Sequence, residues 1–80
     1  RLPYNTPEDN IDDAWNEIIR RTGPLVQVAD GKWRTPDGRW QVRGMMADIG
    51  PDVTDPHFHI ERINPKTGQV TSNEHIRFSP

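Results

Sequence analysis

The chain has 80 residues, of which 31% are hydrophobic, and it carries a net charge of −2 at neutral pH and no cysteine. A domain of this length buries only about 60% of the surface that its unfolded chain exposes, which excludes an enzyme with a multi-layer core. The lack of cysteine excludes a disulfide framework and a thiolate zinc site, and the net charge gives no global attraction to nucleic acid or anionic lipid.

A single domain over residues 1–80 fits this length, and we expect one thin core layer. No apolar run approaches the roughly 18 residues that cross a membrane. Because the sequence opens on Arg1 and not on a methionine, we also expect the domain to be a segment of a longer protein.

The first predicted elements are an extended arm and a helix. Residues 1–9 contain two prolines and no hydrophobic periodicity, which predicts the arm. The helix follows because Asn10 is a suitable N-cap and Gly23 and Pro24 stop the run. Its apolar residues recur at a spacing of three and four and form one stripe: Ile11, Ala14, Trp15, Ile18 and Ile19. The stripe predicts that the helix packs against another layer.

The rest of the chain predicts strands joined by turns. The β-prone stretches are 25–28, 33–35, 39–43, 57–63 and 69–78, with turns at 30–31, 36–38 and 64–68. The segment 44–56 contains three aspartates and Gly50-Pro51, and we expect an irregular loop there. Together these elements predict an α+β fold, with the N-terminal helix packed on a curled antiparallel sheet of about four strands.

Alternation along the last strands gathers polar side chains on one face of this sheet. Residues two apart in a strand share a face, so Phe58 and Ile60 are predicted to face the helix. His57, His59 and Glu61 then face the opposite way, and all three histidines of the chain meet there. The same parity places further polar residues on the histidine side: Arg39, Gln41, Arg43, Asn73, His75 and Arg77. A plain solvated face would show the same parity, but three imidazoles beside guanidinium groups favour a functional site.

The chemistry that this face suits is cleavage of RNA, whose 2′-hydroxyl is a built-in nucleophile. Such cleavage needs a base, an acid and cations near the phosphate, and histidine can supply both proton transfers. The candidate catalytic residues are His57, His59, His75, Arg43, Arg77 and Glu61, with His59 and His75 favoured as the acid–base pair because they lie in mid-strand. The candidate substrate contacts are Arg39, Gln41, Asn73 and Trp33, of which Trp33 is either a core residue or a platform that stacks a base. No metal or cofactor is needed.

Two other functions stay open at this point. His57 and His59 on one strand and His75 on the next could bind zinc through three imidazoles. Glu61 stands too close to His59 for the metal-binding pattern of cupins, and neighbouring arginines would repel a cation. The third possibility is an interaction module without catalysis, which explains the small size better than it explains the histidines.

The segment from Lys32 to Arg43 resembles C-terminal toxin domains of bacterial contact-dependent growth inhibition and related polymorphic toxin systems. The segments 56–61, 64–68 and 73–76 share this resemblance. Many such domains are similar to the barnase, EndoU, colicin and RelE group of metal-independent ribonucleases, in which a helix precedes an antiparallel sheet. The resemblance implies cleavage of RNA, often transfer RNA, in the cytoplasm of a target bacterium.

The resemblance also implies delivery as part of a larger secreted or surface protein, and a cognate immunity protein that blocks the site. The group carries its catalytic residues on the exposed sheet face, where the matching positions are His57, His59, His75, Arg43 and Arg77. It does not fix which histidine is the base. The negative net charge departs from the basic character of most ribonucleases, which predicts a defined RNA substrate or a helper protein.

Overall fold

The fold follows the α+β order that the sequence predicts. The structure, a computed structural model, describes residues 8–79, so residues 1–7 of the expected arm lie outside the described residues. In chain order the elements are α1 (Ile11–Thr22), β1 (Val26–Ala29), β2 (Lys32–Arg34), β3 (Trp40–Arg43), α2 (Met46–Ile49), β4 (His57–Ile63) and β5 (Val70–Arg77). Neither helix in residues 8–79 is long and apolar enough to cross a membrane.

Helix α1 begins and ends where the capping residues predict. The N–H of Asp13 donates to Asn10 Oδ1 at 2.9 Å, which satisfies one of the free N–H groups of the first turn. At the other end Gly23 has a φ of 81°, a conformation that favours glycine, and its N–H donates to the carbonyl of Ile19 at 2.8 Å. Both boundaries of the helix therefore follow from single residues.

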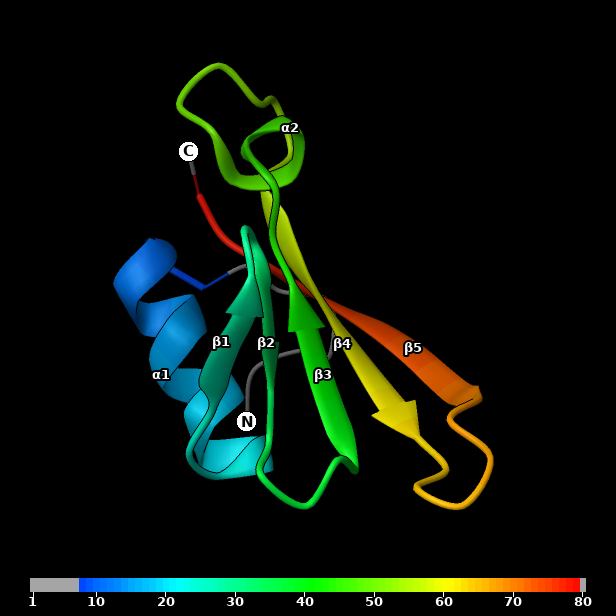
Figure 1. The fold of residues 1–80 in the computed structure, drawn as a ribbon. Coiled ribbons are helices and arrows are strands. Elements are labelled where there is room, and N and C mark those ends of the chain that lie inside the picture. Colours follow the sequence, from blue (N-terminus) through cyan, green and yellow to red (C-terminus); the bar gives the residue numbers. More distant parts are fainter. Residues whose placement is uncertain (1–7, 80) are drawn as a thin grey trace.

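The sheet has five strands in the order β1-β2-β3-β4-β5, one more than the expected number of about four (Figure 1). Every neighbouring pair is antiparallel, so the sheet is a simple meander with an open edge at β1 and at β5. The β4–β5 register shifts between Arg62 and Ile63. The extra residue of this irregularity is Thr71 on β5, so the strand that bulges is β5, opposite the end of β4.

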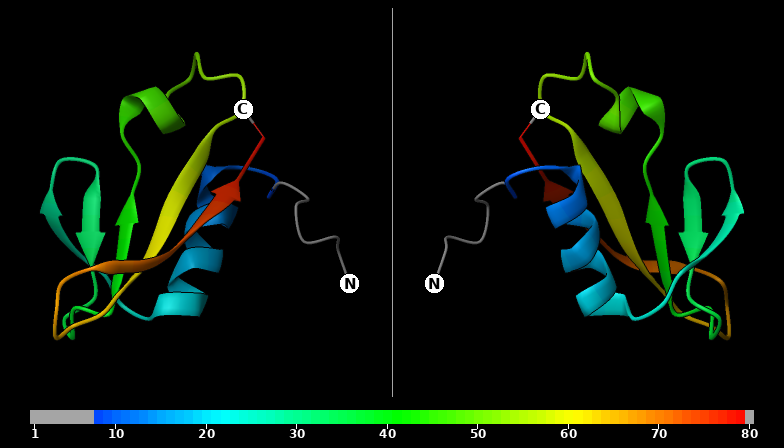
Figure 2. Two further views of the ribbon diagram at one scale, coloured as in Figure 1. Left: turned by 90° about the vertical axis from the view of Figure 1, so that its right-hand side faces the viewer. Right: turned by 90° about the vertical axis from the view of Figure 1, so that its left-hand side faces the viewer.

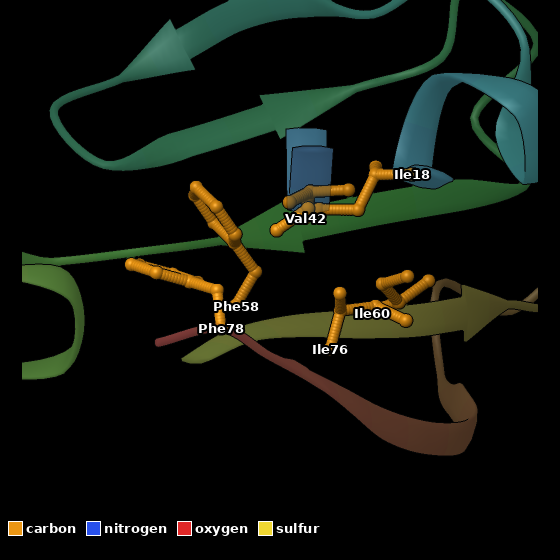
Figure 3. Close-up of a cluster of buried hydrophobic side chains, with 7 residues drawn as sticks. Ile18, Val42, Phe58, Ile60, Ile76 and Phe78 are labelled. Atoms are coloured by element: carbon orange, nitrogen blue, oxygen red, sulfur yellow. The ribbon is translucent and has the colours of Figure 1, made fainter. Parts of the chain in front are cut away.

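The core lies between α1 and one face of the sheet (Figure 2). Side chains from α1, β3, β4 and the end of the chain meet there, as Figure 3 shows. The buried cluster consists of Ala14, Ile18, Val42, Phe58, Ile60, Ile76 and Phe78, with Trp15, Leu25, Trp33, Trp40 and Ile49 packed partly buried around it. The predicted facing of Phe58, Ile60 and Ile76 is confirmed. Ile19 lies outside this cluster, in contrast to the expectation that it shares the core with Ile18.

The segment 44–56 is more ordered than the irregular loop predicted for it, because it contains α2. Ile49 from this short helix packs against the core. At the start of this segment the backbone of Gly44 passes close to the ring of Phe58. A Cβ atom at this position would lie 2.6 Å from that ring, so only glycine fits without a shift. The helix thus sits at the end of the sheet, beside the first residues of β4 (Figure 1).

Candidate functional site

Three imidazoles meet on the face of the sheet opposite α1. His57 and His59 lie two residues apart on β4, and His59 is in register with His75 on β5. The ring centroids of His59 and His75 are 4.5 Å apart, and that of His57 lies 4.9 Å from His59 and 4.8 Å from His75. We call these three residues the histidine cluster. The convergence predicted from strand parity is confirmed.

A row of cations continues from the cluster across the sheet. Arg43 on β3 pairs with His59, and Lys32 on β2 pairs with Arg43. The order across four strands is therefore Lys32, Arg43, His59 and His75. Because neighbouring strands lie about 4.8 Å apart, this row runs roughly 14 Å across the sheet.

Glu61 is held by the residues around it. Its side chain is almost fully buried, and it accepts hydrogen bonds from Gln41 Nε2 at 2.8 Å and from Arg43 Nε at 3.0 Å and Nη2 at 3.2 Å. The Oε1 atom of Gln41 in turn accepts from the guanidinium of Arg34 at 2.6 Å. Glu61 thus orients Arg43, and Gln41 in turn supports Glu61.

Asp55 supports the other end of the cluster. Its backbone carbonyl lies 2.8 Å from Nδ1 of His57, and its carboxylate accepts from Nε of Arg77 at 2.9 Å. A carbonyl oxygen can only accept, so the proton of neutral His57 sits on Nδ1 and its Nε2 keeps a lone pair. Arg77 lies beside the cluster because its backbone pairs with that of His57.

The side chain of His59 is partly buried. It is 18% exposed, and its Nδ1 is buried without a hydrogen-bond partner among residues 8–79. Burial lowers the pKa of His59 below its ordinary value, and the charges of His75, Arg43 and His57 lower it further. The carboxylate of Asp48, 3.9 Å from Nε2 of His59, acts in the opposite direction but does not cancel these effects. His59 is therefore a neutral imidazole near pH 7.

All four predicted substrate contacts lie outside the cluster, and one of them, Gln41, is buried against Glu61. Trp33 is on the other face of the sheet, where its ring centroid lies 5.0 Å from that of Trp15 in the partly buried shell of the core. Arg39 stands at the β2–β3 turn, 3.7 Å from Asp37 and four residues before Arg43. Asn73 is exposed and pairs with Glu61, two residues along each strand from the pair of His59 and His75. Of the other predicted residues, the structure brings His57, His59, His75, Arg43 and Arg77 together.

Sequence reasoning missed four residues that border the site: Lys32, Arg34, Asp48 and Asp55. Lys32 and Arg34 flank the inward-facing Trp33, so the same alternation rule could have placed them on the histidine face. Asp48 and Asp55 belong to the segment between β3 and β4. Nothing in their spacing predicts that this segment folds back toward β4.

Comparisons with known proteins give no match: no family model, no curated protein and no solved structure matches this chain.

Proposed function

We propose that the protein is a metal-independent endoribonuclease toxin that cleaves RNA, with transfer RNA as the substrate class, by attack of the 2′-hydroxyl on the adjacent phosphate. The observation that carries this proposal is the convergence of the histidine cluster with Arg43 on the sheet face opposite α1 (Figure 2). Imidazole pairs and guanidinium groups are the side chains that phosphoryl chemistry without metal requires.

The reaction needs two proton transfers. The 2′-oxygen bonds to phosphorus as its proton passes to a base, and the bond from phosphorus to the 5′-oxygen breaks as that oxygen takes a proton from an acid. The products are a 2′,3′-cyclic phosphate and a 5′-hydroxyl. His59 and His75 lie next to each other, with ring centroids 4.5 Å apart, so one phosphate bound above the pair could be reached by both rings. We assign the base to the partly buried His59 and the acid to the exposed His75.

Arg43 stabilises the extra negative charge of the phosphorane in this proposal. Glu61 occupies two of its five N–H donors, which leaves three for phosphate oxygens. Glu61 fixes the guanidinium plane and takes no proton itself. This arrangement favours the transition state because the donors are positioned before the substrate binds.

The biological context of the proposal comes from the resemblance of segments 32–43, 56–61, 64–68 and 73–76 to toxin domains. In that context a larger secreted or surface protein delivers the domain into a target bacterium, where it acts on RNA in the cytoplasm. The producing cell needs a cognate immunity protein that keeps the histidine face from RNA.

The test is incubation of the 80-residue chain with total RNA in excess EDTA, followed by analysis of the new ends. We expect fragments with 2′,3′-cyclic phosphate ends. His59→Ala and His75→Ala should each lower the rate about 10²–10⁴-fold, as expected for loss of a general acid or base. Ser72→Ala, at an exposed position on β5 that is assigned no substrate contact, is the control and should cleave normally. Cleavage that EDTA abolishes, or full activity of both histidine variants, would contradict the proposal.

A further inference from the structure

We propose that the histidine cluster binds one Zn²⁺ ion through its three imidazoles, and that this ion inhibits the ribonuclease. The first part of this inference concerns metal binding and stands on the geometry alone. The second part, inhibition, rests on the proposed function.

The distances between the donor nitrogens fit a single ion. One ring nitrogen from each of His57, His59 and His75 lies within 4.8 Å of the other two. A tetrahedral zinc ion with Zn–N bonds of 2.0–2.1 Å needs nitrogens about 3.3 Å apart. The rings must therefore approach by no more than about 1.5 Å, which small rotations of the side chains can supply. His75, the exposed member, has the most freedom to make this movement.

The protonation pattern also suits a metal ion. Nδ1 of His57 donates to the carbonyl of Asp55 at 2.8 Å, so the lone pair for a metal is on Nε2. A backbone carbonyl on the far nitrogen is a usual outer contact of metal-bound histidine, because it fixes the ring and the tautomer. Nδ1 of His59 is buried without a partner among residues 8–79, and a metal ion is a partner that an imidazole nitrogen accepts.

Carboxylates beside the cluster weaken the objection that nearby arginines repel a cation. Arg43 is paired with Glu61 at 3.0 Å, and Arg77 with Asp55 at 2.9 Å. Asp48 adds a carboxylate 3.9 Å from Nε2 of His59. Each guanidinium next to the cluster thus has a carboxylate beside it, and this pairing is not visible in the sequence.

Inhibition follows from the ligand set. A metal ion takes the lone pairs that His59 and His75 need for their proton transfers, so bound zinc and catalysis exclude each other. Three protein ligands leave one coordination position for water or for a phosphate oxygen of RNA. Zinc would then hold the RNA without the base that activates its 2′-hydroxyl.

The binding test is a calorimetric titration of the 80-residue chain with ZnCl₂ in metal-free buffer at fixed pH. We expect one ion per chain. His57→Ala and His75→Ala should each weaken zinc binding at least about tenfold, because losing a direct ligand costs at least as much as losing an outer contact. Asn73→Ala on the same face should bind zinc like the original chain, and MgCl₂ should give no heat because magnesium prefers oxygen ligands. Circular dichroism of each variant checks that it folds. No binding, or unchanged binding by both histidine variants, overturns the site.

The inhibition test adds ZnCl₂ to the RNA cleavage reaction. We expect the rate to fall at least about tenfold at saturating zinc and to recover fully with EDTA. Faster cleavage with zinc overturns the inhibition and identifies a metal-dependent enzyme. If the chain cleaves no RNA under any condition, the proposed function and the inhibition fall together, while the titration still decides the metal site.

Discussion

Glu61 carries the most buried charge on the histidine face, with an exposed fraction of 6%. A carboxylate in this position is stable only because Gln41 and Arg43 donate to it. These hydrogen bonds satisfy the buried carboxylate, whereas the buried Nδ1 of His59 has no hydrogen-bond partner among residues 8–79. At the residue scale the two side chains therefore differ: Glu61 is fully engaged in holding Arg43, and His59 is the residue for which we propose a direct role in binding or catalysis.

Glu61→Gln tests this division. Glutamine has a single acceptor oxygen and presents an NH₂ group to donors on Gln41 or Arg43. We expect the free energy of unfolding, measured with urea, to fall by about 1–3 kcal/mol. RNA cleavage should fall less than about tenfold, since Arg43 loses orientation but no proton donor or acceptor is lost. A fall of a thousandfold at unchanged stability would instead make Glu61 a catalytic residue.

The convergence of the histidines was predictable from the sequence, because strand parity depends only on spacing. The alternation from His57 to Glu61 and the pairing of the last three strands were enough to place three imidazoles and Arg43 together. The ion pairs of Arg43 and Arg77 were not predictable. They depend on side-chain torsions and on the path of segment 44–56, which no periodic pattern describes.

At the scale of elements, a group of charged side chains connects α1 to the sheet. Glu17 accepts from Arg20 at 2.6 Å and from Arg21 at 2.9 Å. Arg21 also reaches Glu74 on β5 at 3.0 Å. The helix thus contacts β5 through ion pairs as well as through its apolar stripe.

The pH dependence of stability reports on this group. Hydrogen bonding to Arg20, and less strongly to Arg21, holds the pKa of Glu17 below the ordinary value of 4.5. A carboxyl with a lowered pKa stabilises the fold above its ordinary pKa, and this contribution is lost as the pH falls through the lowered value. Glu17→Gln should therefore destabilise the protein at pH 7 by up to about 1 kcal/mol, since Arg20 is largely exposed.

Urea unfolding of the Glu17→Gln variant at several pH values checks this expectation. The difference from the original chain should shrink toward zero as the pH approaches the lowered pKa of Glu17. Asp52→Asn, at an exposed loop position, should show a smaller difference at pH 7. A Glu17→Gln effect that stays constant down to low pH would show that the ion pairs contribute nothing.

The helix was easier to predict than the segment after β3. Asn10 and Gly23 mark the ends of α1, and each acts through a local hydrogen bond that sequence patterns describe well. Helix α2 has four residues and no apolar stripe of its own. It forms because Ile49 reaches the core and Gly44 lets the chain pass Phe58, which are tertiary effects.

At the scale of the whole molecule, one thin core supports the entire site. Ile60 is 2% exposed. It lies on β4 between His59 and Glu61, and its side chain points to the opposite face of the sheet from theirs. Ile60→Ala should lower the free energy of unfolding by about 2–5 kcal/mol, a large part of the stability of a small domain. Val70→Ala, at an exposed position on β5, is the control and should cost less than about 1 kcal/mol. Equal melting temperatures for the two variants would refute the observed facing of β4.

The two faces of the molecule also differ in charge, which bears on the expected immunity protein. Lys32 and Arg43 extend from the histidine cluster on the open face, whereas Asp12 and Asp13 lie on α1, across the sheet. An inhibitor that covers the open face should therefore present carboxylates to these cations and associate in a salt-dependent way.

Loss of either cation should weaken such a complex. We expect Arg43→Ala to cost about 2 kcal/mol or more, close to a 30-fold rise in Kd. Because that change also leaves Glu61 without its guanidinium, Lys32→Ala provides the second test: Lys32 has no ion pair within residues 8–79, so its removal leaves the fold intact. Asp12→Asn on α1 is the control and should leave Kd unchanged. If Asp12→Asn weakens the affinity more than Lys32→Ala does, the inhibitor binds the helix. The histidine face would then stay open, which contradicts direct blocking of the site.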